Sequence, residues 1–114
     1  VDYTCIPQLN RAMQLAAVSS IAAYAGCANT FISIAPPVQH KDTSAPADEA
    51  TYARRGWCRL EQLSFILVHG LASAHVFGTG MSLLADKQGW LQHAINVFDG
   101  DFSVEKDKEL LVDV

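Results

Sequence analysis

Charged side chains are scarce in this chain. Only 18% of the 114 residues are charged, the net charge is −4, and no basic stripe runs along the sequence. Proteins that bind nucleic acid usually carry clustered lysine and arginine, so we expect no nucleic-acid partner.

Cysteine pairs are also missing. The chain has three cysteines, Cys5, Cys27 and Cys58, which is an odd number without any Cys-x-x-Cys spacing. This pattern is typical of a reduced, cytoplasmic protein and not of a disulfide framework, and it offers no zinc knuckle. His40 and Asp42 lack a third ligand at a useful spacing, so we expect no metal site.

A long hydrophobic run is absent too. The most apolar stretch, residues 12–28, is rich in alanine and contains Gln14, Ser19, Ser20 and Gly26. It is too weakly hydrophobic for a membrane span and lacks a signal-peptide cleavage pattern. Half of the residues are apolar, so a single folded domain over residues 1–114 is expected. Because no initiator methionine is present, we interpret the chain as a fragment truncated at its N-terminus.

Hydrophobic spacing predicts most of the secondary structure. We expect a helix over about residues 6–25 and a short buried strand over 30–35, which two prolines end. Residues 36–56 carry no apolar period and are expected to form a long functional loop. A second helix is predicted from about Trp57 to Val68, followed by a short strand at 75–78.

The last third of the chain gives weaker signals. Residues 83–98 are expected to be helical in part, and Gly100 to Ser103 form a turn, with Ser103 as the cap of a last helix. This order of elements predicts a layered α/β domain whose parallel sheet is flanked by helices, as in flavodoxin-like folds. Two strands do not make a stable sheet, so we expect an upstream strand or a partner chain to complete it.

The segment Arg54–Glu61 has the highest density of chemically capable side chains. It places arginines, an indole, a thiol and the carboxylate of Glu61 at the start of the second helix. Two interpretations are open for Glu61, a catalytic carboxylate or a charge that stabilises the helix dipole. Trp57 either stacks against a bound ligand or packs in the core or against a neighbouring helix. Cys58 is best explained as a small buried hydrophobic side chain. The arginines bind a ligand, form a solvated surface, or pair with Asp48 and Glu49.

A strand, a variable loop and then Trp57-Cys58-x-x-Glu61 at a helix start resemble the TIR (Toll/interleukin-1 receptor/resistance protein) domain. The leucine that follows the glutamate in that family is replaced by Gln62. The segment 24–34 resembles the end of the TIR helix before its central strand, and the segment 36–59 also resembles uncharacterised TIR-like proteins of algae and other protists. The resemblance covers about residues 5–68, and the chain lacks the family's first strand and the following loop, which line its nucleotide pocket.

The resemblance implies a function for this chain. In enzymatic TIR domains the matching glutamate, here Glu61, cleaves NAD at the nicotinamide–ribose bond, so NAD is a substrate and not a cofactor. Trp57 would border the pocket. From their chemistry, and not from the family, we expect Arg54, Arg55 and Arg59 to meet the pyrophosphate.

The alternative that the resemblance implies is a non-enzymatic module for protein–protein interaction in signalling or defence. Such a module would self-associate or bind other TIR-like domains, and an open sheet edge would favour this.

Overall fold

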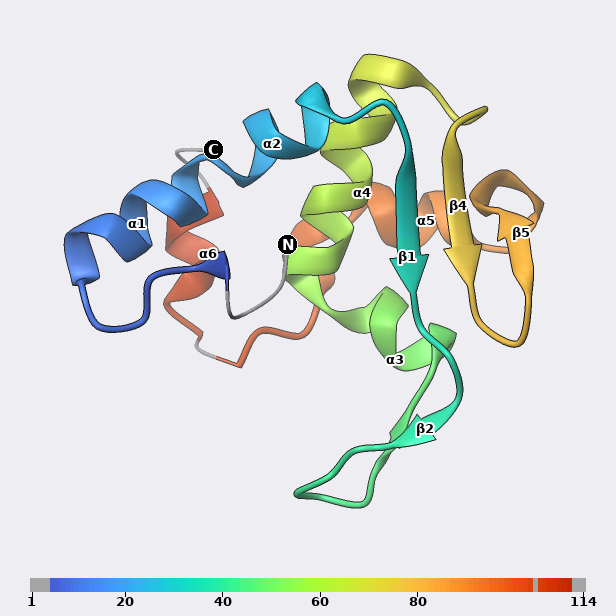
Figure 1. Ribbon diagram of the computed structural model, residues 1–114, viewed down its shortest axis with the longest axis horizontal. Helices are drawn as coiled ribbons and strands as arrows, with labels where there is room; N and C mark the ends of the chain where they lie inside the picture. The colour runs from blue at the N-terminus through green and yellow to red at the C-terminus, as the bar shows by residue number, and fades with distance from the viewer. Residues whose placement is uncertain (1–4, 104, 112–114) are drawn as a thin grey trace.

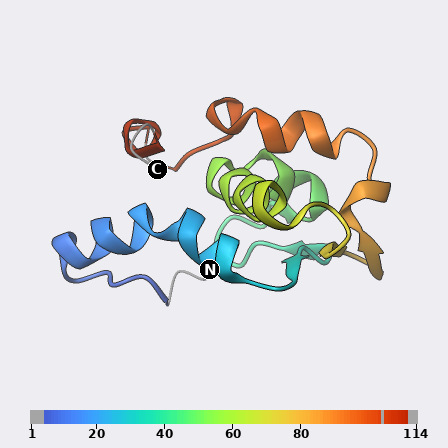
Figure 2. The same cartoon turned by 90° about the horizontal axis from the view of Figure 1, so that it is seen from above.

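A computed structural model describes residues 5–103 and 105–111 of the chain (Figure 1). The elements stack in layers: the main sheet lies on one side, helix α4 lies against it, and α5 lies beyond α4 (Figure 2). The helices are α1 (Arg11–Ser19), α2 (Ile21–Cys27), α3 (Glu49–Arg54), α4 (Gly56–His69), α5 (Trp90–Ile95) and α6 (Asp107–Leu110), with 3-10 turns η2 (Leu84–Asp86) and η3 (Val97–Asp99). The strands are β1 (Phe31–Ile34), β2 (Val38–Gln39), β3 (Pro46–Ala47), β4 (Ala74–Phe77) and β5 (Met81–Leu83).

The main sheet is mixed, with the strand order β1-β4-β5. β1 and β4 are parallel, with Phe31 opposite Ala74 and Ile34 opposite Phe77. β5 then pairs antiparallel to β4. The predicted α/β class and its parallel strand pair are therefore confirmed, but an entirely parallel sheet is not. The third strand comes from residues 81–83 of this chain, next to the segment expected to be partly helical, because a short glycine-containing turn folds it back on β4.

Helix α4 forms the connection between the two parallel strands and packs on one face of the sheet. Phe65 of α4 is fully buried, and its ring centroid lies 5.5 Å from that of Phe31 in β1. The side-chain amide of Gln62 donates to the Ser33 hydroxyl at 2.9 Å, which ties the polar side of α4 to the same strand. The predicted helix and both predicted strands are confirmed here, with boundaries shifted by one or two residues.

The single helix predicted over residues 6–25 is two helices, α1 and α2. α1 begins late because the side chain of Asn10 accepts a hydrogen bond from the Met13 backbone N–H at 3.1 Å and so caps the helix at Arg11. At the break, the Ser20 hydroxyl donates to the carbonyl of Ala16 at 2.7 Å. A serine that bonds to the preceding turn bends a helix, which accounts for the interruption.

The predicted loop over residues 36–56 contains structure of its own. β2 and β3 form a small antiparallel hairpin, and α3 follows it directly. α3 starts with a reciprocal cap: Asp48 accepts from the Thr51 backbone N–H at 2.9 Å, and the Thr51 hydroxyl accepts from the Asp48 N–H at 2.7 Å. The loop prediction was therefore wrong for residues 38–39 and 46–47, which form the hairpin, and for residues 49–54, where this cap replaces the hydrophobic period that usually marks a helix.

The C-terminal part of the chain folds back onto the junction between α3 and α4. The Gly56 N–H donates to the carbonyl of Asp101 at 3.0 Å, and the Asp101 N–H donates to the carbonyl of Arg54 at 2.6 Å. Ser103 does not cap the last helix, because α6 begins at Asp107 with Lys106 at the cap position and without a side-chain cap. Among the described residues, no helix is long and apolar enough to cross a membrane.

Candidate functional site

A cavity of about 480 Å³ lies beyond the carboxyl end of β1. Its walls come from the end of β1 and Pro36 after it, from the β2–β3 hairpin, from the start of α3, and from Arg55 and Ser103. In sheets with parallel strands, ligands bind outside the carboxyl ends of the strands, and pockets for small molecules usually measure about 300–1,000 Å³. The position and the size of this cavity therefore both suit a ligand.

Polar side chains of opposite charge face this cavity. Asp48 and Arg55 line it, together with Thr51 and Tyr52. The backbone hydrogen bond from Thr51 holds the pKa of Asp48 below its usual value, so Asp48 stays ionised near neutral pH. Arg55 lies at the N-cap of α4 and is exposed, so its guanidinium is available to an anion in the cavity.

Tyr52 closes the inner side of the cavity. Its phenol contacts the side chains of Ser33 and Cys58, and burial raises the pKa of Tyr52 far above its usual value. Burial also raises the pKa of the Cys58 thiol, against the opposing charge of Arg55. Both groups are therefore neutral at physiological pH, and Cys58 is a buried packing residue as its sequence context predicted.

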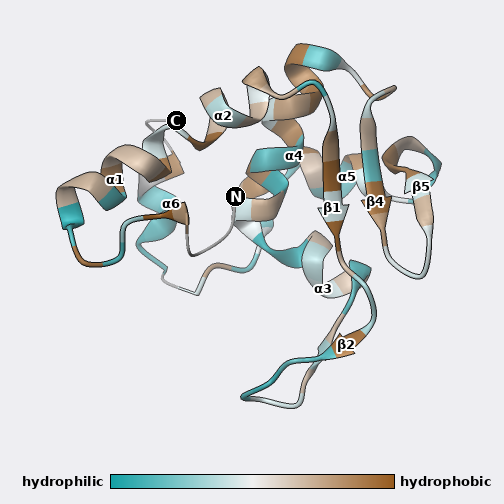
Figure 3. Cartoon of the chain, viewed as in Figure 1, coloured by the Kyte–Doolittle hydropathy of each residue, from teal (hydrophilic) through white to brown (hydrophobic). Residues whose placement is uncertain are grey.

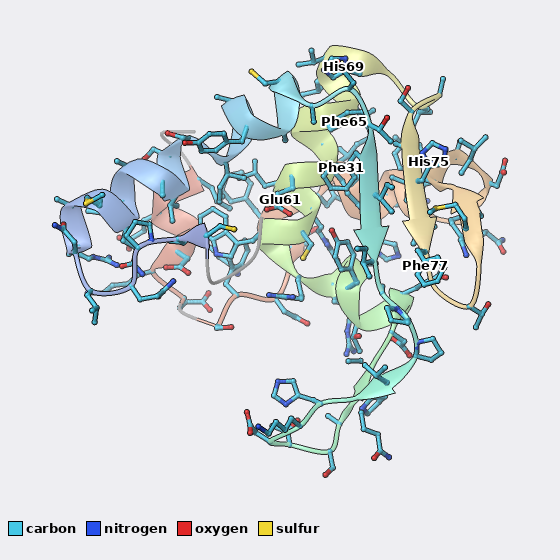
Figure 4. All side chains as sticks on the ribbon, viewed as in Figure 1. Phe31, Glu61, Phe65, His69, His75 and Phe77 are labelled. Atoms are coloured by element: carbon cyan, nitrogen blue, oxygen red, sulfur yellow. The ribbon has the colours of Figure 1, made fainter. Side chains whose placement is uncertain are left out.

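Glu61 lies in the second turn of α4 and is half-buried. Burial raises the pKa of Glu61, and the positive charge of Arg55 opposes that shift. Figure 4 shows Glu61 on the side of α4 that faces away from β1 in that view. Glu61 is not among the residues that line the cavity, whereas Arg55, at the N-cap of the same helix, is.

The other predicted site residues have contacts within the fold. The Trp57 indole N–H donates to Asp107 Oδ2 at 3.2 Å, and its ring packs edge-on against Phe102 with 5.9 Å between centroids. Arg59 is only 6% exposed, and its guanidinium donates to the carbonyls of Ala53 at 2.7 Å and Asn96 at 2.8 Å.

Arg54 is exposed, and its Nε lies 3.8 Å from Asp101 Oδ2. Glu49, a predicted partner of the arginines, pairs with Lys87 at 2.7 Å instead. Of the four residues predicted to contact the nucleotide, only Arg55 lines the cavity.

Sequence reasoning missed Asp48, Thr51 and Tyr52 as cavity residues. The Asp48-x-x-Thr51 cap was a detectable signal, because it starts a helix that directs Tyr52 toward the end of β1. No signal in the sequence places Tyr52 against Ser33, since that contact depends on how α3 packs on the sheet.

A metal site has no support in the described part of the chain, where no three His, Cys, Asp or Glu side chains come close enough to hold an ion. His40 instead makes a local contact, with its Nδ1 accepting from the Asp42 backbone N–H at 3.3 Å.

Comparisons with protein families, with curated proteins and with solved structures find no match for this chain. The function is therefore argued from the chemistry of the site and from the sequence resemblance described above.

Proposed function

We propose that the chain is a TIR-like α/β domain that binds NAD in the cavity at the end of β1 and cleaves its nicotinamide–ribose bond with the carboxylate of Glu61. One observation carries the proposal: Glu61 is half-buried in the second turn of α4, and Arg55, at the N-cap of the same helix, lines the cavity. Burial raises the pKa of this carboxyl group. Perturbed carboxyl groups beside a cavity are enriched at catalytic sites.

The reaction needs little from the protein besides a negative charge. Nicotinamide leaves as a neutral group because the bound precursor is cationic, so no general acid is required. Positive charge develops on the ribosyl centre in an oxocarbenium-like transition state, and a fixed carboxylate stabilises it. In this proposal Glu61 supplies the carboxylate and Arg55 binds the pyrophosphate through its forked donors. As the bond to nicotinamide breaks, a water molecule from solvent bonds to the ribosyl carbon and loses a proton to solvent, which completes the hydrolysis.

Nicotinamide release from NAD by the purified chain tests the role of Glu61. We expect Glu61→Gln to lower turnover at least about 100-fold, as removal of one transition-state contact does elsewhere. Glu109→Gln, at an exposed position of α6, is the control and should keep full turnover. Release that is equal in all three proteins, each folded by circular dichroism, contradicts the assignment.

The pH dependence separates catalysis from folding. Because burial raises the pKa of Glu61, turnover should fall at a higher pH on acidification than an exposed glutamate would give. The effect on stability has the opposite sign. Because its pKa is raised in the folded state, Glu61 contributes most to stability below its unfolded-state pKa. This contribution is lost as the pH rises through its folded-state pKa. Glu61→Gln should therefore not lose stability through this charge at pH 7, and urea unfolding at pH 7 checks that a loss of turnover does not come from unfolding.

Arg55 gives a second test with a neighbour as its control. Arg55→Ala should raise the KM for NAD about 10-fold because it removes a charged contact to the pyrophosphate. Arg54→Ala removes the same charge one position earlier, outside the cavity lining, and should leave the KM unchanged.

The second candidate is a non-enzymatic interaction module, and the edge position of β1 favours it. The N–H groups of Phe31 and Ala35 donate to Ser73 and Phe77, so the alternating N–H groups of Ile32 and Ile34 point to the open edge of the sheet. Such an edge is a template for another strand. A folded chain that associates without releasing nicotinamide would favour this function.

A further inference from the structure

In the part of the chain that the structure describes, one face of the main sheet has no covering layer. α4 and α5 both lie on the other side of the sheet (Figure 2). Parallel strands are normally buried on both faces, because their connecting helices cover both. The view in Figure 3 looks onto the uncovered side, where brown, hydrophobic ribbon runs along β1 and the end of β4.

The register of the strands fixes which side chains form this surface. Ile32, His75 and Leu83 stand side by side in one row, and Ile34, Phe77 and Met81 form the next row. The alternate residues, such as Ser33 and Val76, point to α4 and are buried. We call the six residues Ile32, Ile34, His75, Phe77, Met81 and Leu83 the open face.

The open face is apolar and exposed. Its five hydrophobic residues are exposed as follows: Ile34 70%, Met81 56%, Ile32 45%, Phe77 39% and Leu83 38%. At roughly 190 Å² for a fully exposed large apolar residue, they present about 470 Å² together. The largest apolar patch of a monomeric protein usually measures about 300–600 Å² and is often functional, so the open face has the size of such a patch.

We infer that the open face is a homodimer interface, in which two copies of this chain pack sheet against sheet around a twofold axis. A twofold interface brings the same patch of both copies together, so charged residues of one sign in the patch would repel their own copies. The open face contains no lysine, arginine, aspartate or glutamate. A partner selected by charge would find no complementary group there, whereas a second copy finds a matching apolar surface.

The area and the geometry agree with a reversible dimer. Two open faces supply about 940 Å² of buried surface, which is less than the roughly 1,200 Å² of the smallest stable interfaces and falls in the range of weak, reversible ones. The sheets would pack about 10 Å apart with interdigitating side chains, as in two-layer β proteins. Since β4 is the central strand, Phe77 lies near the middle of the interface, where aromatic residues contribute most to binding.

Sedimentation of the purified chain between about 1 and 200 μM tests the inference, because interfaces of this size give reversible association. We expect a monomer–dimer equilibrium with a micromolar Kd. Phe77→Asp and Met81→Asp should each weaken the dimer at least about 30-fold, since each buries a charge in an apolar interface. Both positions are partly exposed in the monomer, so the variants should remain folded, and circular dichroism checks this.

The two variants also separate this dimer from pairing through the edge of β1. Phe77 and Met81 belong to β4 and β5, away from that edge, so an edge-paired dimer would survive both substitutions. Leu67→Asp is the matched control: Leu67 is 76% exposed on α4, which packs on the other side of the sheet, and this variant should dimerise normally.

Three results would overturn the inference. The first is a chain that stays monomeric at 200 μM, which would leave the open face to a different partner. The second is a dimer that Phe77→Asp and Met81→Asp leave intact. The third is open-ended association without a dimer plateau, because a closed twofold interface stops at two copies. None of these results depends on nicotinamide release, so this inference and the proposed enzyme fail independently.

Discussion

Of the charged residues that the structure describes, Arg59 is the one with a buried side chain. Its guanidinium reaches the last turn of α3 through Ala53 and the start of η3 through Asn96, while its own backbone belongs to α4. A buried charge is tolerated only where hydrogen bonds replace its hydration, and here two carbonyls do so. Arg59 therefore ties three segments together, which is a structural role and not a binding role.

Truncation of this side chain gives a stability prediction. Arg59→Ala should lower the free energy of unfolding by about 3 kcal/mol, because it removes two charge-assisted hydrogen bonds that a buried guanidinium makes to the carbonyls of Ala53 and Asn96. Arg54→Ala removes an exposed side chain with a 3.8 Å ion pair and should cost less than about 1 kcal/mol. Urea unfolding of both variants checks this, and equal losses would show that the bonds of Arg59 contribute nothing special.

The motif Arg54–Glu61 also shows what sequence proximity cannot predict. The prediction that its side chains share one pocket treated them as neighbours, but side chains at a helix start spread about 100° apart per residue. Arg55 therefore faces the cavity, Trp57 packs against the C-terminal segment, and Arg59 points inward. The motif identified the right junction, but the direction of each side chain depended on segments that the sequence alone did not bring together.

At the scale of elements, two glycines let the C-terminal segment approach the start of α4. A Cβ on Gly100 would collide with the backbone Cα of Gly56 and would lie 2.7 Å from its nitrogen. A Cβ on Gly56 would collide in turn with the ring of Phe102. The short parallel bridge between Arg55 and Asp101 depends on this close contact.

Gly100→Ala should therefore lower the free energy of unfolding by about 2–3 kcal/mol, because the atoms in its way are backbone atoms that cannot rotate aside. Gly80→Ala is the control, since no atom lies within 4 Å of a Cβ at that position. It should change stability by less than about 1 kcal/mol. Thermal unfolding of the two variants compares them directly, and a mild effect of Gly100→Ala would mean that the C-terminal segment can move away from α4 at little cost.

Elements with a strong local signal were predictable, and elements defined by their partners were not. β1 is a β-branched run ended by prolines, and α4 carries a regular apolar spacing, so both were predicted with nearly correct bounds. β5 has three residues and exists because β4 offers a pairing edge. α3 has six residues and begins at a cap formed by Asp48. Because it is so short, it has no hydrophobic period from which it could be predicted.

At the scale of the whole molecule, stability is centred on one unit, the two parallel strands and the helix that connects them. The core cluster draws on α2, α4, β4 and η2, and consists of Ala25, Phe65, Ala74, Val76 and Leu84. β4 is paired on both sides, whereas β1 and β5 are edges. The expectation that an upstream strand or a partner chain completes the sheet came from counting strands. β5 supplies a third strand from within the chain, and among the described residues the outer edge of β1 and one face of the sheet stay open.

This centre predicts how hydrogen exchange varies along the chain. Amides of β4 and of the middle of α4 should exchange only through global unfolding, at least about 1,000-fold more slowly than those of α1. α1 buries no side chain, so its hydrogen bonds open without disturbing the core. α2 is the internal control: it is similarly rich in alanine but buries Ile21 and Ala25 against the rest of the fold, and its protection should fall between the two. Measurement below 1 μM keeps the proposed dimer dissociated. If α1 were protected as strongly as α2, α1 would belong to the cooperative core, and the unit centred on β4 would be larger than its buried side chains indicate.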